Sequence, residues 1–132
     1  MSVRILTLAL LLAPAVIHAH HSFSAEFDPK KPVKISGAVT KVEWMNPHIY
    51  FYVDVKASGK VSNFAVEGGS PNVLRRLHWG KNSLRIGDRI TVSGFPAKNG
   101  SNVVNAVTVI LPDGTSLFAG SSYFGDESLK AK

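Results

Sequence analysis

The chain contains no cysteine, so disulfide bonds, thiolate metal sites and cysteine nucleophiles are excluded. It has no acidic residue before Glu26, and Arg4 is the only charged residue in that stretch. The apolar run at 5–12 is shorter than the roughly 20 residues that a membrane-spanning helix needs. We therefore expect no transmembrane segment after processing, and a packed core must stabilise the fold without covalent links.

Enzyme motifs are missing as well. The sequence has no G-x-S-x-G nucleophile elbow, no H-E-x-x-H zinc motif, no phosphate-binding loop and no distinct pair of carboxylates. An N-terminal histidine can form the copper brace of oxidative enzymes, but so small a domain offers little scaffold for a substrate platform. We therefore predict a binding protein rather than an enzyme.

The first 19 residues have the three-part form of a secretory signal. Arg4 precedes the apolar run, and Ala19 occupies the position before the expected cleavage point. Ala15 ends a second A-x-A sequence, so cleavage after that residue is the alternative. We predict that residues 1–19 are a cleaved signal peptide and that the mature protein is periplasmic.

The chain is basic. Its net charge is +6 at pH 7, and loss of Arg4 with the signal would lower that charge by one. Such a balance favours anionic surfaces or ligands in a general way. Nucleic acid is not an expected partner, because an exported protein seldom meets it. The expected partners are a metal ion, a small ligand or an envelope protein.

Alternating apolar and polar residues predict five β-strands in the mature chain. Their expected ranges are 33–45, 48–55, 61–67, 89–95 and 102–111. The second strand alternates most cleanly, and one of its faces is the expected core face. That face consists of Ile49, Phe51, Val53 and Val55.

Glycine marks irregular points between and within these strands. Gly37, together with a change of phase between Val39 and Val42, predicts a bulge or bend in the first strand. Asn99-Gly100 is the strongest hairpin signal, because both residues tolerate positive φ in a type I′ turn. Ser58-Gly59 is expected to turn the chain between the second and third strands.

One short helix is predicted between the third and fourth strands. Ser70 supplies an N-cap hydroxyl, and Pro71 suits the first helical position because its missing N–H is not needed there. Gly80 is expected to end the helix in a left-handed conformation. Pro29 and Pro32 argue against a helix in the segment that leads into the first strand.

Three strands, a helix and a hairpin follow the order of the five-stranded Greek-key barrel called the OB-fold. We therefore predict an all-β protein with one short helix, folded as an OB-like barrel at 20–118. A flexible C-terminal tail is expected at 119–132. A five-stranded sandwich or an unrelated open sheet is the alternative architecture.

Four segments together carry a family resemblance: HHSFSAEFD, KVEWMNPHIYFYVDV, EGGSPNVLRRL and SLRIGDRITVSGFPAKNG. In these segments the chain resembles a family of exported bacterial proteins that is defined only as a domain of unknown function. The resemblance spans about residues 20–118 and implies export and a single β-rich domain. His78 stands where that family is expected to have glycine. The residues implied to lie at motif positions are His20, His21, Trp44, Asn46, Pro47, His48, Glu67 and Pro71.

A second likeness is to periplasmic copper-carrying OB-fold metallochaperones. Those proteins use a histidine, methionines and a tryptophan on neighbouring strands, and this chain is similar in having Trp44, Met45 and His48 close in sequence. It departs from their pattern because Met45 is the only methionine beyond the predicted signal. The likeness implies a copper site, but one that is poor in thioether ligands.

A metal site is also predicted from the residues themselves. A mature chain that starts at His20 would place its α-amine beside the imidazoles of His20 and His21, and His48 can supply a third nitrogen. Such ligands suit copper, zinc or nickel, and copper binds most tightly of the three. Glu67 can act behind the site by orienting an imidazole. The alternative is a frayed terminus and a structural His48, with no metal.

A metal-free OB-fold interaction module is the other candidate function. It would bind an envelope protein, a glycan or an anionic small ligand. Trp44 and Met45 precede the second strand, and Tyr50 and Tyr52 lie within it, so these four residues can face a ligand there. For Trp44 and Trp79, packing in the small barrel is the favoured role, whereas the role of the two tyrosines stays open.

An anion site is the remaining candidate. Gly68-Gly69-Ser70 precedes the predicted helix and can present backbone N–H groups to an anion. Arg75 and Arg76 lie on the helix and could extend such a site. An ordinary capped turn followed by a solvated helix face is the alternative interpretation.

Overall fold

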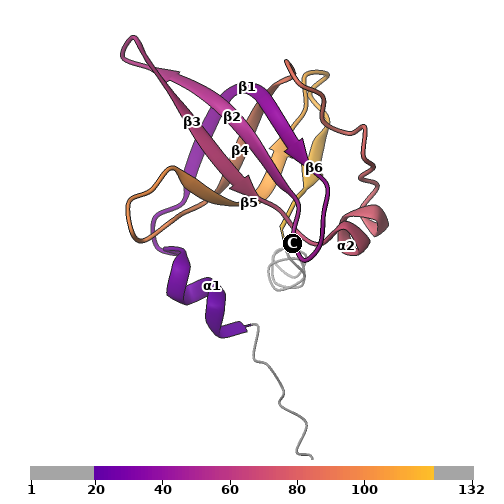
Figure 1. Cartoon of the computed structure of the whole chain (residues 1–132), viewed down its shortest axis with the longest axis horizontal. Helices are drawn as coiled ribbons and strands as arrows, with labels where there is room; N and C mark the ends of the chain where they lie inside the picture. Colours follow the sequence, from indigo (N-terminus) through magenta and orange to yellow (C-terminus); the bar gives the residue numbers. More distant parts are fainter. Residues whose placement is uncertain (1–19, 121–132) are drawn as a thin grey trace, which may run out of the picture.

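The computed structural model describes residues 20–120, with side chains from Phe23 onward. The predicted signal peptide and the predicted tail from 121 onward lie outside the described residues. Five strands close into a barrel, with a small helix at one end and a second helix below it (Figure 1). None of the helices described is long and apolar enough to cross a membrane.

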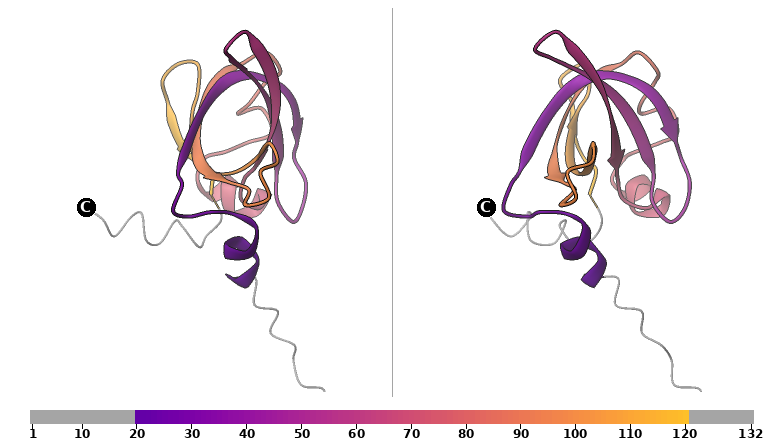
Figure 2. Two further views of the ribbon diagram at one scale, coloured as in Figure 1. Left: turned by 90° about the vertical axis from the view of Figure 1, so that its left-hand side faces the viewer. Right: turned by 60° about the vertical axis from the view of Figure 1, so that its left-hand side comes forward.

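The barrel has the strand order of an OB-fold. Its strands are β1 (Val33–Glu43), β2 (Tyr50–Ala57), β3 (Lys60–Glu67), β4 (Arg89–Pro96) and β5 (Val103–Ile110). β1 pairs with both β2 and β4, β2 pairs with β3, β4 pairs with β5, and a parallel pairing of β3 with β5 closes the ring (Figure 2). The predicted fold class is therefore confirmed. A sixth strand, β6 (Ser116–Phe118), pairs with β5 outside the ring and was not predicted.

The barrel interior is apolar and fully closed to solvent. Ile49, Phe51 and Val53 have no exposed surface, as predicted for one face of β2, whereas Val55 near the strand end is only partly buried. The predicted irregularity in β1 is a register shift after Val39. Burying these side chains provides most of the favourable free energy of folding, because the chain has no covalent links to add.

The helix α2 (Pro71–Arg76) begins as predicted but ends differently. The Ser70 hydroxyl accepts a hydrogen bond from the backbone N–H of Val73. His78, with φ of 68°, takes the left-handed conformation that was predicted for Gly80. The reversal comes earlier because Trp79 is buried, with its indole N–H donating to the Phe118 carbonyl.

The type I′ turn lies between β2 and β3, and not between β4 and β5 where it was predicted. Ser58 and Gly59 both have positive φ and join β2 to β3 as a two-residue loop, which is the type I′ geometry. At the β4–β5 loop only Gly100 has positive φ, so the type I′ prediction for Asn99-Gly100 was wrong. The Asn99 side chain instead accepts hydrogen bonds from the backbone N–H and hydroxyl of Ser101, which holds a longer turn.

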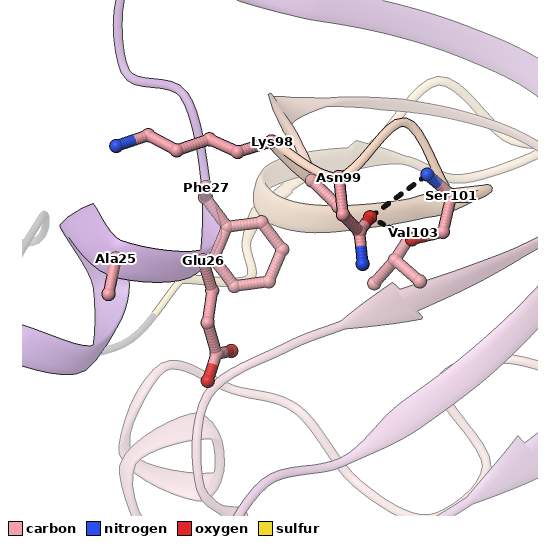
Figure 3. Close-up of a pocket in the computed structure, with 8 residues that line it drawn as sticks. Ala25, Glu26, Phe27, Lys98, Asn99, Ser101 and Val103 are labelled. Atoms are coloured by element: carbon pink, nitrogen blue, oxygen red, sulfur yellow. Dashed lines mark hydrogen bonds between the residues drawn. The ribbon is translucent and has the colours of Figure 1, made fainter.

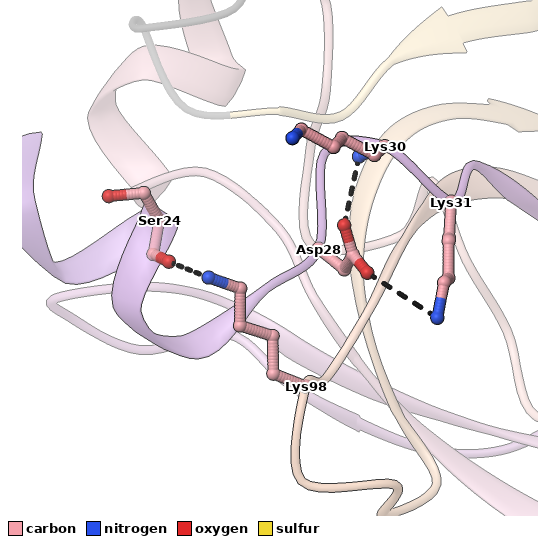
Figure 4. Close-up of polar contacts among 5 residues, drawn as sticks. All are labelled: Ser24, Asp28, Lys30, Lys31 and Lys98. Atoms are coloured by element: carbon pink, nitrogen blue, oxygen red, sulfur yellow. Dashed lines mark hydrogen bonds and ion pairs between the residues drawn. The ribbon is translucent and has the colours of Figure 1, made fainter.

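A short helix, α1 (His20–Glu26), precedes the barrel, so the expectation of no helix in the lead-in segment was wrong. Pro29 and Pro32 follow the end of α1, and a proline does not disturb a helix that has already ended. The helix is tied to the β4–β5 loop by the Lys98 backbone N–H, which donates to the Glu26 carbonyl at 2.8 Å. The Lys98 ammonium also donates to the Ser24 carbonyl (Figure 4).

Aromatic packing adds to this attachment. The rings of Phe23 and Phe27 stack with centroids 5.5 Å apart, and Phe23 meets Phe95 of β4 edge-on at 5.8 Å. Phe27 itself is buried and forms an isolated β-bridge with Ala97. The segment that leads into the barrel is therefore fixed against its outer face.

Candidate functional site

A row of side chains crosses the outer face of the barrel at one end of the strands. Tyr50 is the register partner of Glu67, Glu67 is the partner of Asn105, and Asn105 is the partner of Phe95. Neighbouring residues such as Val66 and Val104 point into the core, so the row faces outward. Glu67 and Asn105 are nevertheless only 8% and 6% exposed. This is a buried polar patch outside the core.

His48 extends the row beyond the start of β2. It lies in the β1–β2 loop, just after the cis peptide bond between Asn46 and Pro47. Its Nδ1 atom is 2.7 Å from Oε1 of Glu67, and its side chain is 39% exposed whereas that of Glu67 is 11% exposed. The buried carboxylate therefore contacts the inner nitrogen of a ring whose other edge can meet solvent.

Tyr50 lies on the other side of the same carboxylate. Burial raises the pKa of Tyr50 to about 12, and the negative charge of Glu67 and a hydrogen bond to it act in the same direction. Glu26 of α1 contributes a smaller electrostatic effect. The phenol is therefore neutral at physiological pH. The end of α1 lies close enough to Tyr50 for the Glu26 carboxylate to raise its pKa.

Asn105 leaves one hydrogen-bonding atom unused. Its Oδ1 atom is buried and has no hydrogen-bond partner among the described residues. A buried amide oxygen without a donor costs free energy, so such groups are rare in folded proteins. The patch thus combines a buried carboxylate with an unpaired carbonyl oxygen.

The other predicted ligand-facing residues lie elsewhere. Trp44 packs against the core, and its buried indole N–H has no hydrogen-bond partner in the part of the chain that the structure describes. Met45 is 52% exposed. The Tyr52 hydroxyl donates to Glu43, and Lys41 approaches the Tyr52 ring. These residues do not join the row at Glu67.

Two backbone donors of the predicted anion site are already engaged. The backbone N–H of Gly68 donates to the Ile49 carbonyl, and that of Gly69 donates to the Ala119 carbonyl. The Ser70 hydroxyl is occupied as the helix cap. Arg75 and Arg76 are exposed on α2. Residue 119, expected to begin the tail, is thus buried and bonded to the barrel.

The predicted metal ligands are only partly placed. The backbones of His20 and His21 form the start of α1, and their side chains lie outside the described part. Among the side chains that are described, no group of three or more histidines or carboxylates is arranged to hold a metal ion. His48 and Glu67 are therefore brought together, while the position of the two N-terminal imidazoles relative to them is not given.

Sequence reasoning missed Asn105 and Glu26. Asn105 reads as an ordinary polar residue in a strand, and only the parallel pairing of β3 with β5 places it beside Glu67. Glu26 lies in a segment where no helix was expected. Nothing in the sequence around Glu26 indicated that it would lie near Tyr50.

Comparison with known families gives one match. The family model described as "Family of unknown function (DUF6152)" matches residues 9–105. The search of curated proteins gives no match. The match agrees with the resemblance read from the four motif segments, since the family is one without an assigned function. Because residues 9–105 make up most of the chain, the protein belongs to this family of unknown function.

Proposed function

We propose that the protein is a periplasmic binding module that holds a divalent transition metal, copper foremost, for sequestration or transfer. The contact between His48 and Glu67 is the observation that carries the proposal. Histidines that bind metals commonly have a carboxylate at the second ring nitrogen, which fixes the tautomer and makes the ligand more basic. Here that carboxylate is buried and the imidazole is half-exposed, so Nε2 is left for the metal.

The N-terminal histidines supply the remaining ligands in this proposal. Glu26 at the end of α1 influences Tyr50, which lies beside Glu67. The seven residues of α1 span about 10 Å, so His20 and His21 lie within roughly one helix length of the same face. Nitrogen ligands favour copper over zinc and nickel. Export would generate the α-amine that completes the chelate.

The first experiment tests metal binding directly. Protein recovered from the periplasm of an expressing bacterium is measured by intact mass, with and without added Cu(II). We expect a chain that starts at His20 and gains the mass of one copper ion. A chain that starts elsewhere, or that gains no mass with copper, would contradict the proposal.

The second experiment tests the ligands. Calorimetric titration with Cu(II) compares His48→Ala and a His20→Ala, His21→Ala double variant with the unmodified protein. His78→Asn is the matched control, because it removes an exposed imidazole and asparagine tolerates the positive φ. We expect weaker binding in the first two and no change in the control. Equal binding in all four would exclude the site.

The metal-free interaction module is the second candidate. Tyr50 and Tyr52 alternate with core residues on the outward face of β2, where OB-folds bind their ligands. In that case binding to an envelope partner would persist in chelator and fall when the tyrosines are changed. A metal-dependent interaction would show the reverse behaviour.

A further inference from the structure

A cleft of about 520 Å³ is lined by residues of α1 and of the β4–β5 loop, and His48 is not among them. Its walls include Glu26 and Phe27 on one side and Lys98, Asn99, Ser101 and Val103 on the other (Figure 3). This volume is within the range of small-molecule sites. The cleft lies beside the β4–β5 loop, one of the two loops that OB-folds use for ligands.

The cleft is lined by one carboxylate, Glu26, and one ammonium, Lys98, and only the ammonium has a partner in the described structure. The Lys98 chain runs over α1 and its ammonium points away from the Glu26 carboxylate, toward the Ser24 carbonyl (Figures 3 and 4). Asn99 and Ser101 bond to each other. Within the described structure the Glu26 carboxylate has no hydrogen-bond or ion-pair partner, and Glu26 is exposed and lines the cleft.

The same face also holds an acceptor without a donor among the described residues, the Oδ1 atom of Asn105. Asn105 lies two residues beyond Val103 on β5, so both side chains leave the same face of the strand. The unpaired Oδ1 of Asn105 and the buried carboxylate of Glu67 are both acceptors.

From this arrangement we propose that the cleft binds a small organic cation, an amine with a compact apolar body. The ammonium group would pair with Glu26, and the apolar body would lie against the wall formed by Phe27 and Val103. An anionic ligand is disfavoured because Lys98 is committed to α1. His48 of the proposed metal site does not line the cleft.

Three probes of the same shape test the charge preference. Phenethylamine is a cation, 2-phenylethanol is neutral and 3-phenylpropanoate is an anion. Each is titrated into isotopically labelled protein while backbone amide shifts are followed by NMR. We expect saturable shifts at residues 25–27 and 97–103 with phenethylamine, binding at least about fivefold tighter than the other two. Equal binding of all three, or no binding of phenethylamine, would overturn the proposal.

Variants identify the carboxylate responsible. Glu26→Gln should weaken phenethylamine binding about fivefold or more, whereas Asp113→Asn, which removes the same charge in the β5–β6 turn, should not. His48→Ala should leave amine binding unchanged, which separates this site from the metal site. High salt should weaken binding of phenethylamine but not of 2-phenylethanol, because salt screens the charge on the amine. This test uses the unmodified protein. Unchanged binding in Glu26→Gln or in high salt would contradict a Glu26 site.

Discussion

The Nδ1 atom of His48 lies 2.7 Å from Oε1 of Glu67. The pair joins the β1–β2 loop to the end of β3, so an exposed imidazole is fixed by a carboxylate that solvent hardly reaches. This relationship gives His48 a defined orientation that a histidine in a loop would otherwise lack. The same carboxylate also meets Tyr50, which makes Glu67 the centre of the patch.

Replacing Glu67 tests the orienting role. In Glu67→Gln the amide keeps the shape but loses the charge, and we expect Cu(II) affinity to fall roughly 10- to 100-fold by calorimetry. Glu43→Gln is the control, because it makes the same change in β1. Undiminished affinity in Glu67→Gln would show that the carboxylate does not support a metal ligand.

The raised pKa of Tyr50 leads us to expect a loss of stability at alkaline pH. Its pKa is raised to about 12 by burial and by Glu67, above the value near 10 of an unfolded tyrosine. The stabilisation from the neutral phenol is therefore full below pH 10 and is lost as the pH rises toward 12. In an ultraviolet titration, Tyr50→Phe should lose the phenol that ionises near pH 12 in the unmodified protein. Loss of one that ionises near pH 10 would contradict the burial.

Gly37 predicts a severe packing defect. A Cβ atom at this position would lie 2.0 Å from the backbone oxygen of Asp54, so β1 and β2 would have to move apart. We expect Gly37→Ala to lower the free energy of unfolding by about 2–3 kcal/mol. Gly80→Ala, where a Cβ meets nothing within 4 Å, should change it by less than about 0.5 kcal/mol. Denaturant unfolding of both variants measures the difference, and similar values would count against the close approach.

His78 predicts a stabilising substitution. Its φ of 68° is unfavourable for a residue with a Cβ, although histidine tolerates it better than most. His78→Gly should raise the free energy of unfolding by about 0.5–1 kcal/mol, after the greater entropy of glycine in the unfolded chain is included. His78→Val should lower it by about 1 kcal/mol or more. If thermal unfolding shows His78→Val to be more stable than His78→Gly, His78 does not have the left-handed conformation.

The two hydrogen bonds from Lys98 are expected to hold α1 against the barrel. Lys98→Met keeps the backbone N–H bond to Glu26 but removes the ammonium bond to Ser24. Amide hydrogen exchange of Phe27, whose N–H donates to the Phe23 carbonyl, should then become about fivefold faster. Lys60→Met, at the other end of the barrel, is the control. Exchange that is equal in both variants would mean that Lys98 does not hold the helix.

Local patterns in the sequence were sufficient to predict most of the barrel. The alternation in β2 identified Ile49, Phe51 and Val53 as core residues, because successive side chains in a strand leave opposite faces. The Ser70-Pro71 start of α2 was equally local, since a cap needs only its own neighbours. Turn geometry was predicted less well, because Asn99 could bond either as a type I′ residue or through its side chain to Ser101.

The sequence by itself determined the five barrel strands, the start of α2, the core face, and His48 and Glu67 as residues able to act in a site. Only the tertiary structure decided that Glu67 is buried beside His48, that Asn105 lies next to Glu67, and that α1 is bonded to the β4–β5 loop. The reason is physical: periodicity and capping are set by residues a few positions apart. Burial and charge pairing on a barrel depend instead on which distant strands close the ring, and here the parallel pairing of β3 with β5 places Asn105 beside Glu67.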